Sequence, residues 1–314
     1  MRVLVLGAGG IGGYFGGMAA QAGTDVTFLV REPRARFLEQ RGLVIESPSG
    51  TTRLMPKLCT AGAAAERYDL VLLSCKAYDL DSALDAIQPM IKSRTVILPL
   101  LNGINHYRAI DERFGPDRVL GGLCHIGVTM TPQGTIRRMS ASASIVLGQR
   151  GQSFGTGQLA EIASELTSEE AQASVSNDIE RDIWQKFCFL GTLAAATCLL
   201  RGTIAEIQAT SRGKSVLAEI FGEVCAVAEA AGCPQTPQFI EERHRVLATD
   251  GAAMSSSMYR DLLAGNRVES EHILGDLVRR AELSAIHTPY LVAAHCQLQA
   301  YENARRAIGV EVLA

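Results

Sequence analysis

Residues 3–17 read VLVLGAGGIGGYFGG, and the remaining motifs of the chain are interpreted from this segment. The apolar run Val3–Leu6 predicts a buried parallel strand. It leads directly into Gly7–Gly12, which fits the pattern G-x-G-x-x-G. Small and apolar residues continue beyond the turn, as expected of a helix that packs on a sheet. A strand, a glycine turn and a helix in this order are typical of a dinucleotide-binding unit.

Each glycine of the turn has its own physical role. Gly7 allows a tight turn out of the strand, Gly9 lets the backbone approach a pyrophosphate, and Gly12 lets helix and strand pack closely. The start of the helix adds N–H groups and the positive end of its dipole. The alternative is a chance cluster of glycines. The predicted cofactor-binding residues of the turn are Gly7, Ala8, Gly9, Gly10, Ile11 and Gly12.

Length and composition place the chain among ordinary globular proteins. Its 314 residues favour two domains, and 47% apolar and 20% charged residues are usual values. A net charge of −3 argues against nucleic acid or an anionic membrane as a partner. Because no signal peptide is recognisable and the eight cysteines lack a C-x-x-C motif, we expect reduced thiols in a cytoplasmic protein. No Cys/His cluster has metal-ligand spacing, so we expect no metal.

A second strand over 25–30 is followed by Arg31. In a Rossmann unit this position meets the adenosine ribose, where an acid suits NAD and an arginine suits the 2′-phosphate of NADP. Glu32 favours NAD, but Arg34 and Arg36 follow it, so the three arginines together favour NADP. The alternative is a solvated charged turn.

Further strands place two polar residues at the edge of the sheet where ligands bind. Asp69–Cys75 predicts a buried strand that ends at Lys76, and Thr95–Leu101 predicts another that ends at Asn102. Ligands of open α/β sheets bind at the carboxyl ends of the strands. The alternatives are a surface lysine and an asparagine that forms a turn.

The remaining elements of the N-terminal part alternate between strands and helices. Short strands are expected over 43–58 and helices over 79–91 and 155–173. Residues 118–130 and 141–148 are expected to be β structure, with Pro132-Gln133-Gly134 as the turn between them. We therefore predict a doubly wound sheet with an appended antiparallel portion.

Strand signals nearly vanish after Asn177-Asp178, which are good N-cap residues. We place the boundary here, with a dinucleotide-binding domain over 1–176 and an all-α domain over 177–314. Residues 183–200 are almost wholly apolar, and a membrane span is the alternative to a buried core helix. Lys186 stands out inside this run, because burial of an unpaired ammonium is costly. It is either a snorkelling lysine or a functional one, since desolvation makes a lysine a useful acid near neutral pH.

Two later candidates have competing structural explanations. Ser255–Ser257 either cap a helix or bind a carboxylate, and Glu269 is either a site residue or an acid in the first turn of a helix.

Taken together, these motifs resemble the ketopantoate reductases (2-dehydropantoate 2-reductases) nearly end to end. The likeness joins GAGGIG at 7–12, SCKAYD at 74–79, NG at 102–103, DIWQK at 182–186 and SSMYRDLLAGNRVE at 256–269. It implies a Rossmann domain followed by a helical domain, and NADPH-dependent reduction of a 2-oxo acid to a 2-hydroxy acid.

The resemblance also implies roles for residues at the substrate. Lys186 matches the catalytic lysine that protonates the nascent alkoxide, and Glu269 matches the acid that orients substrate and cofactor. Ser257 matches the serine that holds the substrate carboxylate. Asn102 matches an asparagine that lies near the substrate.

On the cofactor side, the resemblance assigns Arg31 to the 2′-phosphate of NADP. Lys76 and Asn102 match residues that contact the cofactor, and Glu269 is shared with the substrate side. Ile126 falls where a backbone contact to the cofactor is expected.

The chain departs from the family one and two helical turns after the lysine. Asparagines of the family are replaced by Leu190 and Ala194, which share a helix face with Lys186. The loss of two polar groups predicts a less polar or differently shaped acid. The alternatives are a dehydrogenase of the 3-hydroxyacid or 6-phosphogluconate type and a non-catalytic NADP-binding sensor. A homodimer through the helical domain also stays open.

Overall fold

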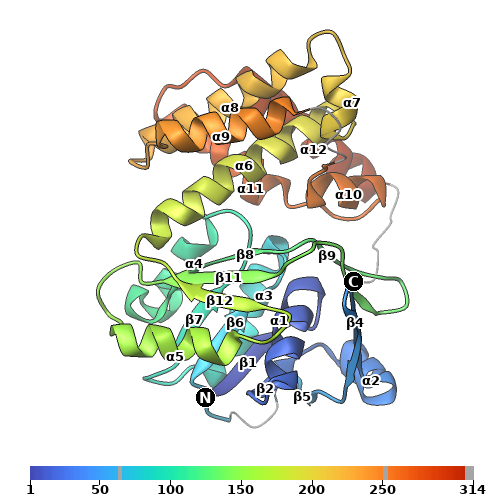
Figure 1. The fold of residues 1–314 in the computed structure, drawn as a ribbon, viewed down its shortest axis with the longest axis vertical. Coiled ribbons are helices and arrows are strands. Elements are labelled where there is room, and N and C mark those ends of the chain that lie inside the picture. Colours follow the sequence, from blue (N-terminus) through green and yellow to red (C-terminus); the bar gives the residue numbers. More distant parts are fainter. Residues whose placement is uncertain (63–65, 250–253, 308–314) are drawn as a thin grey trace. The chain divides into compact units, whose positions relative to one another are not determined.

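The chain folds into two units that we describe separately (Figure 1). The computed structural model describes residues 1–62, 66–249 and 254–307. The first, called the sheet unit, consists of Met1–Asn102 and His106–Ile183. The second, called the helical unit, consists of Gly103–Asn105 and the described chain from Trp184 onward. The division falls inside a helix, seven residues after the boundary expected at 176/177.

The centre of the sheet unit is a parallel sheet with the order β5-β2-β1-β6-β7. Its strands are β1 (Arg2–Leu6), β2 (Asp25–Leu29), β5 (Lys57–Cys59), β6 (Leu70–Leu73) and β7 (Val96–Pro99). The chain runs outward from β1 to β5, returns to β6 and runs outward again. This is the doubly wound Rossmann topology that the sequence predicted, and its switch point lies between β1 and β6.

The helices that cover this unit follow the expected alternation. They are α1 (Gly10–Gln21), α2 (Glu32–Arg41), α3 (Leu80–Ile87), α4 (His106–Phe114) and α5 (Thr156–Leu166), with 3₁₀ turns η1 (Ala77–Asp79), η2 (Gln88–Met90) and η3 (Pro116–Arg118). The helix α1 packs closely on the sheet because a Cβ on Gly16 would stand 2.8 Å from Val5 Cγ2 and 2.9 Å from Phe28 Cε1.

Two smaller sheets complete the unit, with the orders β4-β3-β10-β9 and β12-β11-β8. Their strands are β3 (Leu43–Ser47), β4 (Gly50–Leu54), β8 (Gly121–His125), β9 (Val128–Met130), β10 (Ile136–Arg138), β11 (Ser144–Gly148) and β12 (Gln172–Val175). The antiparallel pairs β8/β11 and β9/β10 confirm an antiparallel portion. An isolated parallel bridge between Ile97 and Val119 connects the approach to β8 with the edge strand β7.

The helix expected over 155–173 is too long, because α5 ends at Leu166 and β12 begins at Gln172. The Thr167 hydroxyl donates to the carbonyl of Ala163 at 2.9 Å and accepts the N–H of Ala173 at 3.1 Å, which turns the chain back. The strand β12 then pairs in parallel with β11, and α5 lies along both (Figure 1). This pairing partner is distant in sequence, so the local pattern does not report it.

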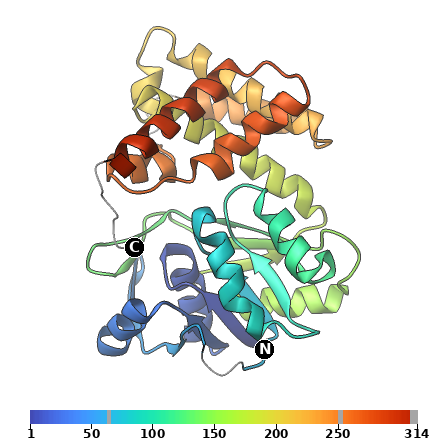
Figure 2. The same ribbon diagram turned by 180° about the vertical axis from the view of Figure 1, so that it is seen from behind.

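The helical unit contains the all-α part that was predicted. Its elements are α6 (Ile179–Leu200), which begins in the sheet unit, α7 (Ile204–Gln208), α8 (Gly213–Ala230), α9 (Pro237–Ala248), α10 (Ser257–Leu263), α11 (Ser270–Leu283) and α12 (Pro289–Ala307). Asp178 caps α6, since its Oδ1 accepts the N–H of Arg181 at 3.2 Å. Figure 2 shows α12 in dark red across this unit, packed on α11 and α8.

In the described part of the chain, α6 is the one helix that is long and apolar enough to cross a membrane, and 61% of its most apolar window is buried. Phe187, Ala195 and Cys198 of this helix lie in the apolar core of the helical unit. The helix therefore packs as a core helix, as predicted. Each of the eight cysteines carries a thiol, and none forms a disulfide.

Candidate functional site

Each predicted cofactor-binding residue of the sheet unit follows the carboxyl end of a strand, and all but Ile126 follow strands of the central sheet. The glycine turn follows β1, Arg31 follows β2, and Lys76 follows β6. Asn102 follows β7, and Ile126 follows β8. Since β5, β2, β1, β6 and β7 run parallel, four of these ends meet at the same sheet edge, on both sides of the switch point. Ile126 is half-buried and packs against the core of this unit.

The glycine turn has the geometry that the sequence predicted. Gly7 has a φ of +88°, in the region that favours glycine. A Cβ on Gly12 would overlap the Gly7 carbonyl oxygen and the Ser74 hydroxyl, so only glycine lets α1 approach β1 this closely. A Cβ on Gly9, by contrast, would meet no heavy atom of the described chain within 4 Å. The backbone at Gly9 therefore stays open to an approaching ligand.

The start of α1 fits the pyrophosphate of a dinucleotide. Gly9 is the N-cap and has an extended backbone with φ −86° and ψ −163°, and no side chain caps this helix. The first intrahelical bond runs from the N–H of Gly13 to the carbonyl of Gly9 at 2.8 Å. The N–H groups of the three residues between them have no acceptor within the helix. They provide donors for an anion at the positive end of the helix dipole.

Arg31 lies where the adenosine ribose of a bound dinucleotide is expected. Its side chain is 61% exposed, and Nη2 forms an ion pair of 3.1 Å with Oδ2 of Asp79 in η1. The pair joins the residues after β2 to those after β6, on either side of β1. An exposed guanidinium that one carboxylate holds from the side keeps other donors for a phosphate.

The structure corrects the argument that three neighbouring arginines favour NADP. Arg34 turns back into the unit, where Nη2 donates to the carbonyls of Ala8 at 3.0 Å and Gly134 at 3.3 Å. Burial lowers the pKa of this guanidinium. Arg34 therefore supports the glycine turn through the backbone carbonyl of Ala8. Of the three arginines, only Arg31 and Arg36 are exposed.

Sequence reasoning missed two residues that hold the turn in place. Arg34 is one of them, because its bond to Ala8 crosses from α2 to the turn. Ser74 is the other, since its hydroxyl donates to the carbonyl of Leu6 at 2.9 Å and ties the end of β6 to the end of β1. No local pattern signals either bond, because both join segments that are distant in sequence.

The helical unit carries three of the four residues predicted at the substrate, whereas Asn102 belongs to the sheet unit. Lys186 is half-buried and lies in the first half of α6. Leu190, one turn later, is half-buried and packs against the apolar core, and Ala194 is 1% exposed within that core. The face of α6 that follows Lys186 is thus apolar for two turns.

The serine cluster separates into a structural residue and a site candidate. Ser256 is the N-cap of α10, because its Oγ accepts the N–H of Tyr259 at 3.0 Å. Ser257 is the first residue of that helix and is half-buried. Capping therefore accounts for Ser256, and the hydroxyl of Ser257 remains the candidate hydrogen-bond donor to the substrate carboxylate.

Glu269 is buried, with 9% of its surface exposed, and stands at the N-cap position of α11 without capping it through its side chain. The segment before it is held by α12. Oε1 of Glu302 accepts the N–H of Val268 at 2.8 Å, and the Tyr301 hydroxyl donates to the carbonyl of Asn266 at 2.7 Å. A buried carboxylate on a segment held in this way has a defined position, as a site residue requires.

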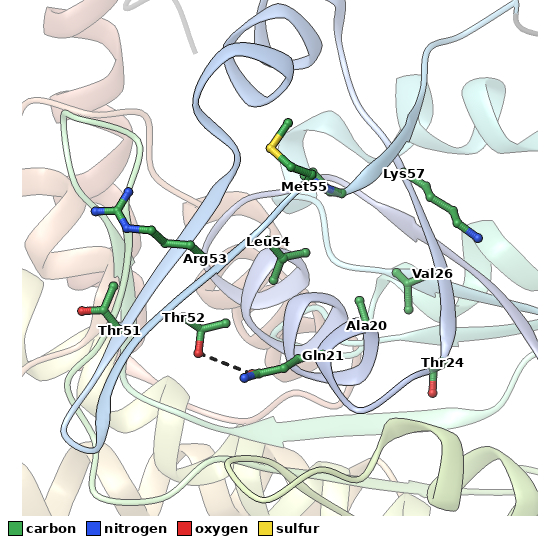
Figure 3. Close-up of a pocket in the computed structure, with 11 residues that line it drawn as sticks. Ala20, Gln21, Thr24, Val26, Thr51, Thr52, Arg53, Leu54, Met55 and Lys57 are labelled. Carbon is green, nitrogen blue, oxygen red and sulfur yellow. Dashed lines mark hydrogen bonds between the residues drawn. The ribbon is translucent and has the colours of Figure 1, made fainter.

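An open hollow of about 400 Å³ lies elsewhere in the sheet unit (Figure 3). It is bordered by the end of α1, the start of β2 and the strands β4 and β5, so it faces away from the glycine turn. Of the two cations that line it, Arg53 and Lys57, the second is paired with Asp25 at 2.6 Å, and Thr52 donates to Gln21 at 3.4 Å. We assign no function to this hollow. Among the described residues, no group of three His, Cys, Asp or Glu side chains is placed to hold a metal ion.

Two family models match the chain. The model described as ketopantoate reductase PanE/ApbA matches residues 3–152. The model described as ketopantoate reductase PanE/ApbA C terminal matches residues 178–302. Together they cover most of the sequence, including every site residue named above.

Relatives of similar length span the chain. The uncharacterized oxidoreductase YkpB of Bacillus subtilis is 36% identical over 303 residues, which are 96% of this chain and 99% of that protein. The 2-dehydropantoate 2-reductase of Halobacterium salinarum is 29% identical over 293 residues, 93% of this chain and 95% of that one.

Solved structures share the fold. A ternary structure of D-mandelate dehydrogenase with NADH and anilino(oxo)acetate has a TM-score of 0.87 at 24% identity and covers 98% of this chain and 100% of that one. The 2-dehydropantoate 2-reductase from Geobacter metallireducens has a TM-score of 0.86 at 23% identity and covers 96% and 99%. With both domain models matched in order, the chain belongs to the ketopantoate reductase family of oxidoreductases.

Proposed function

We propose that this protein reduces a 2-oxo acid to the 2-hydroxy acid with NADPH, and that Lys186 is the proton donor. The observation that carries the proposal is the open glycine turn at the start of α1, in a chain that belongs to this family. The turn supplies the dinucleotide site, and the helical unit supplies a half-buried lysine and a buried carboxylate.

The residues at the sheet edge would hold the cofactor. Backbone N–H groups at the start of α1 bind the pyrophosphate, and Arg31 binds the 2′-phosphate. Lys76, Asn102, Ile126 and Glu269 complete the cofactor contacts that the family resemblance predicts. When bound, the dihydronicotinamide supplies the hydride for C2 of the oxo acid.

The helical unit would bind and protonate the substrate. The Ser257 hydroxyl donates to the substrate carboxylate, and Glu269 orients the substrate or the lysine, with Asn102 also near the substrate. Lys186 Nζ donates its proton to the carbonyl oxygen as negative charge develops there. A positioned cation that becomes a proton donor stabilises that charge throughout the step.

The apolar face at Leu190 and Ala194 favours an acid that is less polar than 2-dehydropantoate or shaped differently, such as a plain branched 2-oxo acid. An NADPH-oxidation screen tests this with 2-dehydropantoate beside 2-oxoisovalerate and larger apolar 2-oxo acids. Turnover of 2-dehydropantoate would place the activity in pantothenate biosynthesis. We expect a cytoplasmic enzyme without a nucleic-acid, membrane or metal partner, and a homodimer through the helical unit stays open.

A parallel assay with NADP⁺ and 3-hydroxy acids, read as NADPH formation, separates the first alternative. Oxidation of 3-hydroxy acids, when no 2-oxo acid is reduced, would assign the chain to the 3-hydroxyacid or 6-phosphogluconate type of dehydrogenase. A change in NADPH fluorescence on binding, without oxidation by any acid of the panel, would indicate a sensor.

The choice of NADPH over NADH depends on Arg31. Replacement of Arg31 with alanine should raise KM for NADPH roughly tenfold to 100-fold, because charge-assisted hydrogen bonds contribute about 1.5–3 kcal/mol. It should leave KM for NADH unchanged, since NADH has no 2′-phosphate. Steady-state kinetics with both cofactors measure the change. Arg41→Ala, in the last turn of α2, the helix that begins directly after Arg31, is the matched control. Equal use of both cofactors by the unmodified protein would contradict the assignment.

A further inference from the structure

We propose that Thr197 is a positioning residue for the substrate, because it fixes the start of α10 and thereby the hydroxyl of Ser257. The inference depends on the proposed function, since that function gives Ser257 its substrate. Thr197 lies on α6, eleven residues after Lys186. Eleven residues are close to three full turns of a helix, so Thr197 and Lys186 share one face of α6.

A buried hydrogen bond connects the two helices. Oγ1 of Thr197 lies 2.8 Å from Oγ of Ser256, and Thr197 is 0% and Ser256 5% exposed. Ser256 is the N-cap of α10, and Ser257 is the next residue. The bond therefore joins the helix that carries Lys186 to the residue that starts the helix carrying Ser257.

The direction of each hydrogen bond follows from the number of hydrogens available. The single hydrogen of the Thr197 hydroxyl goes to the carbonyl of Leu193, 2.6 Å away. Thr197 Oγ1 is thus the acceptor toward Ser256, and the Ser256 hydroxyl is the donor. Ser256 Oγ in turn accepts the N–H of Tyr259 at 3.0 Å. A directed chain runs from Tyr259 N–H through Ser256 and Thr197 to the carbonyl of Leu193.

This series of hydrogen bonds sets the position of α10 along α6. The thiol of Cys198 also lies within hydrogen-bond reach of both hydroxyls, so Thr197 provides the oxygen acceptor of a small buried cluster. A cap residue that is held in this way leaves the first residues of the helix little freedom, and Ser257 is the first of them. A substrate that contacts Lys186 and Ser257 together needs a constant spacing between them. Loss of the Thr197 oxygen leaves the Ser256 hydroxyl buried without its oxygen acceptor, which favours displacement of the cap.

The test compares Thr197→Val with Thr197→Ser and with a matched control. Thr192 is also fully buried on α6 and also donates to the carbonyl four residues before it, at 2.8 Å, but within the described residues its hydroxyl forms no hydrogen bond to another helix. Thr197→Val should raise KM for the best 2-oxo acid of the screen at least tenfold and change kcat less than threefold. Thr197→Ser keeps the hydroxyl, so its KM should stay within twofold of the value for the unmodified protein. Thr192→Val should leave KM unchanged. The dissociation constant for NADPH should stay constant in all three variants.

Amide hydrogen exchange at Tyr259 provides a readout independent of turnover. It should be at least tenfold faster in Thr197→Val and unchanged in Thr192→Val. Ser256→Ala removes the bond to Thr197 and also the cap bond to the Tyr259 N–H, so it should raise KM at least as much as Thr197→Val. The double variant should be no worse than Ser256→Ala alone, because that variant already lacks the bond that Thr197→Val removes. A KM within twofold of the unmodified protein in folded Thr197→Val overturns the proposal, and so does unchanged exchange at Tyr259. An unmodified protein that turns over no acid of the panel overturns the proposed function instead, and the exchange rate then still decides whether Thr197 holds α10.

Discussion

Replacement of Lys186 with alanine should lower kcat at least 100-fold, while the dissociation constant for NADPH changes less than threefold. The loss corresponds to removal of a general acid, which usually contributes about 10²–10⁴-fold. Cofactor affinity is retained because the predicted pyrophosphate and 2′-phosphate contacts come from the sheet unit. Steady-state NADPH oxidation with a saturating 2-oxo acid measures kcat, and NADPH fluorescence measures the dissociation constant.

Two further lysine variants show whether the loss of kcat comes from the missing proton donor, from the missing positive charge, or from replacing any lysine of this unit. Lys186→Arg keeps the positive charge, but a guanidinium holds its proton near neutral pH, so kcat should still fall at least tenfold. Lys214→Ala, at an exposed position on α8 of the same unit, should leave kcat within twofold. A Lys186→Ala variant that turns over within threefold of the unmodified rate would remove this lysine from the mechanism.

Replacement of Gly12 with alanine should damage both the stability and the cofactor site of the sheet unit. The added methyl group would overlap the Gly7 carbonyl oxygen and the Ser74 hydroxyl and stand 3.1 Å from Val5 Cγ1. Because backbone cannot move aside as a flexible side chain does, α1 must shift away from β1. Overpacking of this kind costs about 1–3 kcal/mol, or a fall in Tm of roughly 4–8 °C for about 2 kcal/mol. NADPH should bind at least tenfold more weakly, since the start of α1 is displaced.

Substitutions at two other glycines separate the effect on stability from the effect on NADPH binding. Gly9→Ala adds a methyl group that meets no atom of the described chain within 4 Å, at a φ that alanine adopts. It should leave Tm unchanged and weaken NADPH binding, because it fills the space open to the pyrophosphate. Gly222→Ala, at an exposed position inside α8, should leave binding unchanged and raise stability by about 0.5–1 kcal/mol. Thermal unfolding and fluorescence titration on all three variants check the pattern. Gly12→Ala with unchanged Tm would show that α1 does not need this close contact.

Some features were predictable because their causes are local. The positive φ of Gly7, the apolar run of β1 and the small residues of α1 lie within one short segment, and so does the cap at Asp178. The carboxyl ends of strands were also predictable, so Lys76 and Asn102 lie at the expected edge. The helix predicted beyond Leu166 was wrong because β12 owes its conformation to pairing with β11.

In the candidate site, too, local features could be predicted and long-range contacts could not. Arginine is a residue type that often binds phosphate, yet the guanidinium of Arg34 donates a hydrogen bond to the carbonyl of Ala8. No sequence pattern distinguishes Arg34 from Arg31, which stays exposed. Ser256 and Ser257 are identical in type and adjacent. Only the bonds to Tyr259 and Thr197 identify the first as the cap and leave the second for a ligand.

The glycine turn, the doubly wound order of strands and helices, and the lysine on an apolar helix could be predicted from local sequence, because steric constraints and hydrophobic periodicity act over a few neighbouring residues. Three features became visible only in the folded chain: β5 rather than β3 joins the central sheet, Arg34 supports the turn, and Thr197 bonds to the cap of α10. They escape prediction because strand pairing and side-chain hydrogen bonds join atoms that are close in space but distant along the chain. For Thr197 and Ser256 these atoms belong to residues 59 positions apart.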